Sequence, residues 1–332
     1  MRILHVNDVA QVGSTLVHAS EGRDALYQPM LRREVGEGAW ATVQLVVRRA
    51  RDVARLRHAF YHGGFTHVHV HYATFAHLAE LGGVPFSVHL HGGDLLGDMA
   101  GGVKSLLVRR AIRRARRVVV STPDLLARAQ TFRLDAEYVP NPVARSAPSR
   151  PPIVHDQPHV MMLSKMDYLK GWDRQVQVMV DLRAAWPEMS FVFIAEGQLP
   201  SATKQDLSQR LIALGGTPLP LLRRDAYREQ IRNADFAIGQ MEVGALGMSE
   251  LEALALGVVT VADARAHAGA VPNPPVVAPS AARQALTAIW DGGPTAHKAW
   301  AASADDYLRA HHDPTGCLRR LENLLDYQPG VA

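Results

Sequence analysis

Short β-branched and aliphatic runs alternate along the chain with longer segments that carry apolar residues at helical spacing. In the first part, the apolar runs lie at 2–6, 66–72, 84–90 and 116–121, and helix-like segments precede the last three. Strands that alternate with helices in this way are typical of a parallel sheet covered by helices. We therefore predict an α/β domain in the first part of the chain.

The alternation stops near residue 140 and then resumes. Residues 139–159, VPNPVARSAPSRPPIVHDQPH, contain six prolines and little periodicity, which is typical of a linker. The later apolar runs and the helical segments between them lie at 160–164, 190–197, 234–239 and 258–263, and at 171–185, 203–213, 225–233 and 248–256. The pattern predicts two doubly wound, Rossmann-like α/β domains that face each other across a cleft.

The expected boundaries follow from these segments. We place an N-terminal domain at 1–145, a linker at 146–158 and a C-terminal domain at 159–309. Ligands of such sheets bind at the carboxyl ends of the strands, so the cleft is the expected site.

Composition narrows the class of protein. The 332 residues are 47% hydrophobic and 20% charged, which is typical of a globular chain. Cys317 is the single cysteine, so an internal disulfide is excluded and the cytoplasm is expected. No signal-peptide core follows the first strand, and no apolar run reaches the length of about 18 residues typical of a membrane span. The net charge of +4 favours anionic ligands without choosing among them.

A glycine-rich turn at 238–257, IGQMEVGALGMSELEALALG, is the first candidate for chemistry. Gly244 and Gly247 let backbone amides approach a ligand, and the N-terminus of the next helix adds unpaired N–H groups. Together they suit a phosphate or diphosphate, although the spacing matches neither a Walker A loop nor G-x-G-x-x-G. A plain strand-to-helix turn is the alternative.

Acidic and basic side chains flank this turn. Glu252 suits a neutral hydroxyl donor such as a ribose diol, while Glu250 lies about 200° away around the helix. Lys165 and Lys170, in LSKMDYLKGWD, lie at another strand-to-helix turn and can neutralise a diphosphate leaving group. A solvated helix face and two exposed lysines are the alternatives.

Histidines cluster in the first part of the chain. His91, in HLHGGDL, ends a strand before a Gly-Gly turn and can bond a sugar hydroxyl or a phosphate. The alternative is a plain turn histidine, with Asp94 as the N-cap of the next helix. His67, His69 and His71 share one strand face near His89 and His91, a spacing that zinc could use. We expect no metal there, because no carboxylate or cysteine joins them, and assign them to the lining of the acceptor cleft.

A basic segment, KSLLVRRAIRRARR at 104–117, carries seven positive and no negative charges. Leu106, Leu107, Ala111 and Ala115 could share an apolar face, which would suit an anionic membrane at the inner surface of the cell. A solvated helix is the competing interpretation. Nucleic acid is not expected, because no aromatic residues are interleaved for base stacking.

The order of these motifs over more than 300 residues resembles the GT-B glycosyltransferases, specifically family 4 of the retaining enzymes. RILHV, HLHGGDL, YVPNPV, LSKMDYLKGWDR, FIAEGQ and the glycine-rich turn follow one another as in that family, and 310–332 resembles its terminal crossover helix. The resemblance implies an acceptor on the N-terminal domain and a nucleoside-diphosphate sugar on the C-terminal domain, with a UDP or GDP sugar expected.

The resemblance also implies roles for single residues. Lys170 would bind the diphosphate beside Lys165, Glu252 the ribose, and His91 the region of the donor sugar. The other implied donor contacts are Gly197, Gln240, Gly244, Ala245, Leu246, Gly247, Met248 and Ser249. The implied acceptor side consists of Gly13, Ser14, His71, Tyr72 and Asp94.

One departure from the family affects the sugar contact. The family usually has two glutamates with seven residues between them, and counting back from Glu252 reaches Gly244. We assign the missing role to Glu242, with Gln240 or backbone amides as alternatives. The implied reaction retains the anomeric configuration by same-face attack and needs neither metal nor another cofactor. The acceptor, whether a glycan, a lipid-linked sugar or a small molecule, is open.

Two competing functions remain. A hydrolysing sugar-nucleotide epimerase can share the two-domain fold. A non-catalytic subunit that binds a sugar nucleotide would explain the glycine at position 244.

Overall fold

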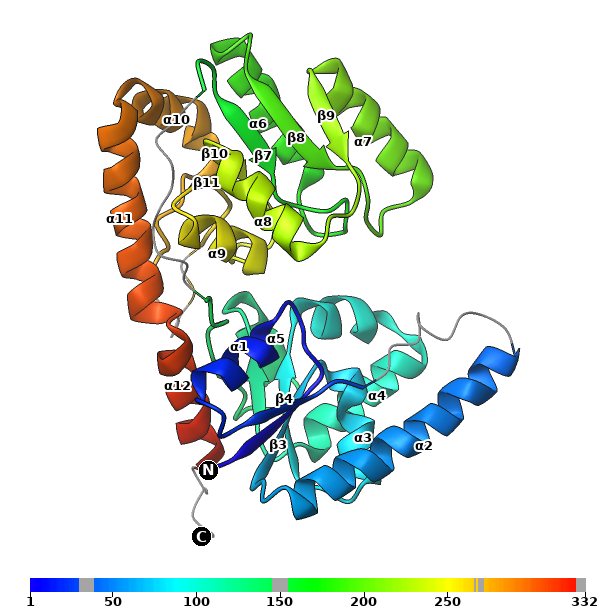
Figure 1. Ribbon diagram of the computed structural model, residues 1–332. Coiled ribbons are helices and arrows are strands. Elements are labelled where there is room, and N and C mark those ends of the chain that lie inside the picture. Colours follow the sequence, from blue (N-terminus) through cyan, green and yellow to red (C-terminus); the bar gives the residue numbers. More distant parts are fainter. Residues whose placement is uncertain (30–38, 145–154, 266, 268–271, 327–332) are drawn as a thin grey trace. The chain divides into compact units, whose positions relative to one another are not determined.

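The computed structural model describes residues 1–29, 39–144, 155–265, 267 and 272–326 (Figure 1). The chain divides into two compact units, Met1–Pro142 with His312–Ala332, and Val143–His311. Most of the predicted linker, 146–154, and the last predicted residues, 327–332, lie outside the described residues.

The first unit is built on a six-stranded sheet. Its strands are β1 (Ile3–Val6), β2 (Ala25–Tyr27), β3 (His67–His71), β4 (Phe86–Leu90), β5 (Val118–Val120) and β6 (Glu137–Tyr138). They pair in the order β2-β1-β3-β4-β5-β6, and every pair is parallel. The central strands are buried nearly throughout, as expected for a parallel sheet covered on both faces.

Helices cover both faces of this sheet. They are α1 (Val12–Ala19), α2 (Ala39–His62), α3 (Ala76–Leu81), α4 (Gly102–Arg114), α5 (Asp124–Gln130) and α12 (Pro314–Asp326). Helices α1 and α12 pack together on one face, and α2, α3 and α4 follow one another on the other (Figure 1). The His312 ring lies 2.8 Å from the Asn141 carbonyl oxygen, so the last helix begins next to the end of the first chain segment.

The second unit is built on a five-stranded sheet. Its strands are β7 (His159–Met162), β8 (Ser190–Ile194), β9 (Gly216–Leu219), β10 (Phe236–Ile238) and β11 (Val259–Val261). They pair in parallel in the order β11-β10-β7-β8-β9. The predicted pair of parallel α/β domains is therefore confirmed.

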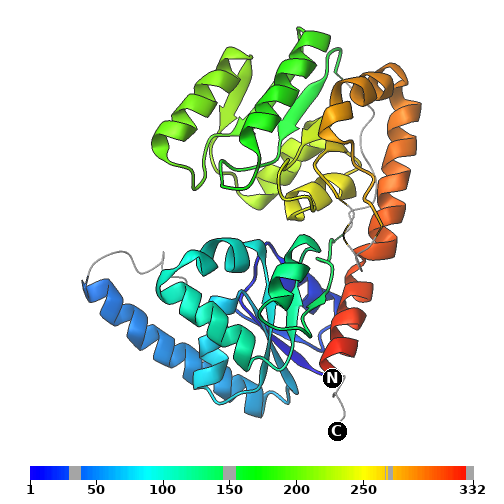
Figure 2. The ribbon, with the colours of Figure 1, turned by 180° about the vertical axis from the view of Figure 1, so that it is seen from behind.

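Alternation along the strands divides the core of the second unit in two. Val160 and Met162 pack under α6 (Trp172–Ala185), α7 (Ser201–Ala213) and α10 (Ala282–Asp291). Met161 and Leu163 pack on the other face, under α8 (Arg224–Asn233) and α9 (Met248–Ala255). Figure 2 shows α6 and α7 side by side on the first of these faces. The remaining helix, α11 (Gly293–His311), contacts α9 and α10.

Three strands were not predicted. β2, β6 and β9 are only three, two and four residues long, and β9 contains Pro218 at the edge of its sheet. Edge positions tolerate proline because one side of the strand makes no ladder bonds. Among the helices in the described part of the chain, none combines the length and the apolar composition that a bilayer crossing requires.

Candidate functional site

Three loops of the second unit lie at one edge of its sheet. They follow β10, β7 and β8, which are neighbouring parallel strands, so their carboxyl ends coincide. Backbone hydrogen bonds join the loops, from Met241 N to Lys170 O (3.1 Å) and from Met166 N to Glu196 O (2.8 Å). This edge brings together the predicted residues of 165–170, 197 and 240–252, and in a parallel α/β sheet it is the usual place for a ligand.

Glu250 holds the glycine-rich loop from inside. Its carboxylate is 1% exposed and accepts hydrogen bonds from Gln240 N and Gly247 N, both at 2.9 Å. A Cβ atom at Gly239 would lie 2.6 Å from Glu250 Cγ, so glycine is needed there to admit the glutamate. Glu250 of the glycine-rich turn therefore shapes the loop and does not face a ligand.

Gln240 has a similar internal role. Its Nε2 donates to Ala245 O (2.8 Å) and Asp263 O (2.7 Å), and its Oε1 accepts from Glu242 N (3.0 Å) and Val243 N (2.8 Å). The side-chain amide uses all of its ordinary hydrogen-bonding capacity within the loop. The alternative that Gln240 contacts the sugar does not fit this arrangement.

The N-terminus of α9 is the anion-binding part of the loop. Gly247 caps the helix, and the first intrahelical bond runs from Leu251 N to Gly247 O (3.1 Å). The N–H groups of Met248 and Ser249 lie in the first turn, where a helix supplies no acceptor. Leu246 packs with Leu251 in an apolar cluster, and Ala245 is also buried, so these two residues offer only backbone to a ligand.

Gly244 takes a conformation that favours glycine. Its φ is +78°, and its carbonyl accepts from Arg265 N (2.9 Å) and from the His267 ring (3.0 Å). Glu242, the proposed substitute for the missing acid, is exposed at the tip of the same loop. Its side chain is thus accessible, and the Arg265 guanidinium lies 3.2 Å from its backbone oxygen.

Glu252 lies on α9, buried and paired. The residue is 7% exposed, and one carboxylate oxygen accepts a hydrogen bond from Arg224, the first residue of α8. Burial raises the pKa of Glu252, and the Arg224 and Arg228 guanidinium groups oppose that rise. Arg224 therefore favours the ionised form of this carboxylate, whose two oxygens can both accept hydrogen bonds from hydroxyl groups.

Replacing Arg224 by glutamine is expected to destabilise the second unit by about 2 kcal/mol at pH 7.5, because a nearly buried carboxylate loses its partner. The loss should shrink at pH 5, since the raised pKa of Glu252 lets the folded variant take up a proton that the unfolded chain binds less tightly. Denaturant unfolding at both pH values measures this. The double variant R224Q/E252Q should recover most of the stability, and a loss in the double variant equal to the sum of the two single losses would contradict the pairing.

The lysines lie on the neighbouring loop. The Lys165 side chain is half exposed, with Nζ 3.6 Å from Asp167 Oδ2. Lys170 is half buried, and within the described chain no carboxylate pairs with its ammonium group. Gly171 follows at φ +65° and its Cβ would meet the Met241 backbone at 3.0 Å, so Lys170 lies directly beside the glycine-rich loop.

Gly197 lies in the third loop, between β8 and α7. A Cβ atom there would lie 2.3 Å from Met166 O, and its φ of +158° also favours glycine. The close approach brings the loop after β8 against the backbone that follows Lys165. Gly197 therefore contributes backbone and space, and its carbonyl accepts from Lys204 Nζ at 3.2 Å.

In the first unit, His91 and Asp94 form a turn after β4. Asp94 is fully buried and accepts from His91 N (2.7 Å) and Ala73 N (3.1 Å). It therefore holds the turn from inside, and its assignment to the acceptor side stays a prediction. The His91 ring is 7% exposed, and burial lowers its pKa to about 3, so it is neutral at physiological pH.

The other predicted acceptor residues surround this turn and the start of α1. Gly13 lets α1 approach β3, since its Cβ would lie 3.3 Å from His71 Cδ2. Ser14 is locally engaged, its Oγ donating to Gln11 O (3.2 Å). Tyr72 is half buried at φ +82° and its hydroxyl lies close to Gly93. His71 itself is fully buried, so it does not line an open surface in this conformation.

The basic segment differs from its predicted pattern. The buried residues of α4 are Ser105, Val108, Ala111 and Ile112, whereas Leu106 is 68% exposed. The predicted apolar face of Leu106, Leu107, Ala111 and Ala115 is therefore wrong, because Ala111 and Ala115 are in the core. Arg110 and Arg114 both pair with Glu80 of α3, so part of the positive charge on this surface is neutralised.

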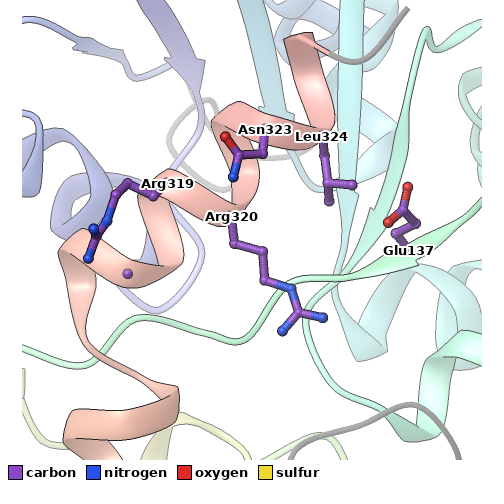
Figure 3. Close-up of a pocket in the computed structure, with 6 residues that line it drawn as sticks. Glu137, Arg319, Arg320, Asn323 and Leu324 are labelled. Carbon is purple, nitrogen blue, oxygen red and sulfur yellow. The ribbon is translucent and has the colours of Figure 1, made fainter. Parts of the chain in front are cut away.

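A hollow of 670 Å³ lies elsewhere on the first unit, between β6 and α12 (Figure 3). Glu137, Arg319, Arg320 and Asn323 are among the residues that line it. Figure 3 shows the two arginine side chains pointing in different directions, so they do not converge on one anion. None of the predicted site residues lines this hollow.

Comparison with known proteins identifies the fold. HepE from Anabaena, solved with UDP and glucose, superposes with a TM-score of 0.69 at 14% identity over 98% of this chain and 99% of that one. Sucrose-phosphate synthase from Thermosynechococcus elongatus gives 0.66 at 13% identity over 98% of both chains. A glycosyltransferase from Rickettsia africae gives 0.62 at 11% identity over 98% and 99%. The chain has the GT-B fold.

The GT-B fold is shared here without recognisable sequence relationship. No protein-family model matches the chain, and no curated protein sequence matches it. The likeness to GT-B glycosyltransferases therefore rests on the comparison of structures, at 11–14% sequence identity. Sequence reasoning missed Arg224 and the internal role of Glu250, although the short distance of Glu250 from the helix start could have suggested a cap.

Proposed function

We propose that this chain is a retaining glycosyltransferase of the family 4 type, which moves a sugar from a nucleoside diphosphate, UDP foremost, to an acceptor without a metal ion. The observation that carries the proposal is the edge of the second sheet. There the N-terminus of α9 and Glu252 lie on elements that adjoin the loop of Lys170, whose ammonium group has no carboxylate partner within the described residues. The HepE structure, which contains UDP and glucose, supports the choice of nucleotide.

Each group has a role in the proposed reaction. The α9 N–H groups and Lys170 bind the diphosphate, and they stabilise the negative charge that grows on it as the anomeric carbon–oxygen bond breaks. Glu252 accepts hydrogen bonds from the ribose hydroxyls, and the exposed Glu242 contacts the sugar. The acceptor oxygen attacks the anomeric carbon from the face that the phosphate leaves. The acceptor proton passes to the departing phosphate, so no protein nucleophile is needed.

His91 takes part as a neutral group. Its Nε2 has no hydrogen-bond partner among the described residues, and burial keeps the ring uncharged. A neutral imidazole can donate a hydrogen bond to a hydroxyl group or accept one from it. We therefore assign to His91 a hydrogen bond with the sugar and not proton transfer.

A second candidate is a non-catalytic subunit that binds a sugar nucleotide for a partner enzyme. The observation that favours it is Gly244 at the position of an expected acid, with Gln240 already used inside the loop. This protein would bind the nucleotide through the same edge but lack the sugar contact needed for transfer.

We also place the protein in the cytoplasm, with α4 against the anionic inner face of a membrane. Val103 is 74% and Leu106 is 68% exposed near the start of α4, and the exposed Arg109 and Arg113 follow. Exposed apolar residues next to arginines suit anionic lipid headgroups. This placement would suit a lipid-linked acceptor.

The first experiment is a thermal-shift panel with UDP, GDP, ADP and TDP, each with and without magnesium. We expect UDP to raise the melting temperature equally in both conditions, because a ligand that binds only the folded state stabilises it by mass action. The hit is followed by release of UDP from UDP sugars and by NMR of the product anomer. No shift with any nucleotide would contradict both candidates, whereas binding without sugar transfer or hydrolysis would favour the second.

A further inference from the structure

Buried histidines occupy one face of the first sheet. They are His5 on β1, His69 and His71 on β3, His89 on β4 and His91 directly after β4. The first four are 0% exposed. The strand register places His5 beside His69 and His71 beside His89, and residues two apart on a strand share a face. So many imidazoles in one dry interior need an explanation, because each has two polar ring nitrogens.

Three of the rings converge. One nitrogen from each of His69, His71 and His89 lies within 4.8 Å of the other two. His69 Nε2 and His89 Nδ1 are 3.3 Å apart. With Zn–N bonds of about 2.0–2.1 Å, two ligands of a tetrahedral zinc ion lie about 3.3 Å apart, so this pair already has the ligand separation. The widest separation would have to close by rotation of the third ring.

The neighbours of these rings favour protonation states that suit metal binding. The Ser87 hydroxyl donates to Val68 O (3.3 Å), so it accepts from His69 Nδ1–H (2.7 Å), which leaves His69 Nε2 unprotonated, with its lone pair toward His89 Nδ1. Such an outer hydrogen bond is what usually orients a ligating histidine.

A second chain of contacts does the same for His71. The Asp24 carboxylate, 3.9 Å from His5 Nε2, favours a proton on that nitrogen. His5 Nδ1 then accepts from His71 Nε2–H at 3.0 Å. His71 Nδ1 then carries no proton, and its lone pair is available to a metal ion. Periodicity in the sequence did not predict this carboxylate, because Asp24 approaches from the start of the short strand β2.

The metal-free cluster leaves polar atoms without partners. His71 Nδ1 and His89 Nε2 are buried and have no hydrogen-bond partner within the described part of the chain. A buried polar group without a partner is costly, and few survive in folded proteins without an ion or a water molecule. Burial also lowers the pKa of all three rings well below the usual value, so they are in the neutral, metal-binding form at physiological pH.

We propose that His69, His71 and His89 bind one divalent transition-metal ion, Zn²⁺ foremost, in the interior of the first unit. The ion would join β3 to β4 and would give the unpaired Nδ1 of His71 a partner. Its role would be structural, so the proposal does not depend on the proposed transferase activity. It replaces, for this cluster, the expectation that no metal binds. Because the three rings are buried, the ion would enter during folding and exchange slowly.

The test uses the full, untagged chain expressed with zinc and purified without chelator. We expect about one zinc per chain by elemental analysis, retained on dialysis against EDTA and lost only on unfolding. Refolding with Zn²⁺ should give a higher melting temperature than refolding with EDTA. In each of the variants His71→Gln and His89→Gln, the affinity for zinc should fall at least 100-fold. The matched control His67→Gln should keep it, because that ring lies at the outer end of β3 and bonds Thr66 Oγ1 (3.1 Å).

Two results would overturn the proposal. One is wild-type protein that neither contains zinc nor gains stability from it on refolding. The other is equal zinc retention in wild type, His71→Gln and His89→Gln. If the two variants do not fold, X-ray absorption at the zinc edge of the wild type decides. Three imidazole nitrogens at about 2.0–2.1 Å support the site, and a shell of sulfur or carboxylate oxygen refutes it.

Discussion

Replacing Lys170 by alanine is expected to lower kcat/KM for sugar transfer about 10²–10³-fold, the usual loss when one group that stabilises a developing negative charge is removed. The folded structure should hardly change, since the ammonium group has no carboxylate partner in the described chain and the contacts to Met241 N and Gln175 Nε2 come from the Lys170 backbone. We expect the free energy of unfolding to stay within about 0.5 kcal/mol of wild type.

The measurement is steady-state release of UDP from the preferred UDP sugar, with UDP affinity measured separately. Lys298→Ala is the matched control, because Lys298 is an exposed lysine on α11 of the same unit. Turnover by K170A equal to that of K298A would remove Lys170 from the site. If K170A lost affinity for UDP but the wild type had no activity, the role of Lys170 in binding UDP would stand and the proposed sugar transfer would be rejected.

Replacing Glu250 by alanine is expected to have the largest effect on stability, about 3–5 kcal/mol. The carboxylate accepts from two backbone amides, so its removal leaves one buried donor, Gln240 N, and one partly buried donor, Gly247 N, without this partner. For a unit of this size the loss corresponds to a fall in melting temperature of about 10 °C. UDP affinity should fall as well, because the loop that leads into α9 loses the side chain that holds both of its ends.

Denaturant unfolding and UDP titration measure both effects. Glu250→Gln keeps one carbonyl acceptor and should lose about half as much stability as the alanine variant. Glu229→Ala serves as a control, since Glu229 is an exposed residue of α8 paired with Arg232. If E250A were as stable as E229A, the hydrogen bonds of Glu250 would not stabilise the loop, and the prediction would be wrong.

Local pattern was enough for much of the fold. Buried β-branched runs such as RRVVVS gave strands, and helical spacing gave the helices between them, because parallel sheets bury both faces of each strand. The strands β2, β6 and β9 were not predicted because they are too short to show an alternation of apolar and polar residues. The two α/β domains were predicted from the alternation of strands and helices on either side of the linker, and the GT-B fold was expected from the order of the motifs.

The site was less predictable because side-chain partners come from distant elements. The sequence places Glu250 and Glu252 on different faces of a helix, but it does not say which is taken up by the loop. Arg224 lies 28 residues before its partner Glu252, on a helix with no motif. Likewise His5 and Asp24 join the histidines of β3 only because β1 lies between β2 and β3. Strand order, and not periodicity, decides such encounters.

The chain leaves the first unit after Pro142 and returns to it at His312. A ribosome therefore releases the whole second unit before α12, which packs on α1, has been made. Until then only the part of α1 that α12 covers is exposed, because β1 and β2 already contact the helix. The first unit must remain free of aggregation during that time. The last helix thus acts as the final step of folding. In a chain that ends before residue 312, the first unit should therefore not fold stably, while the second unit should still fold.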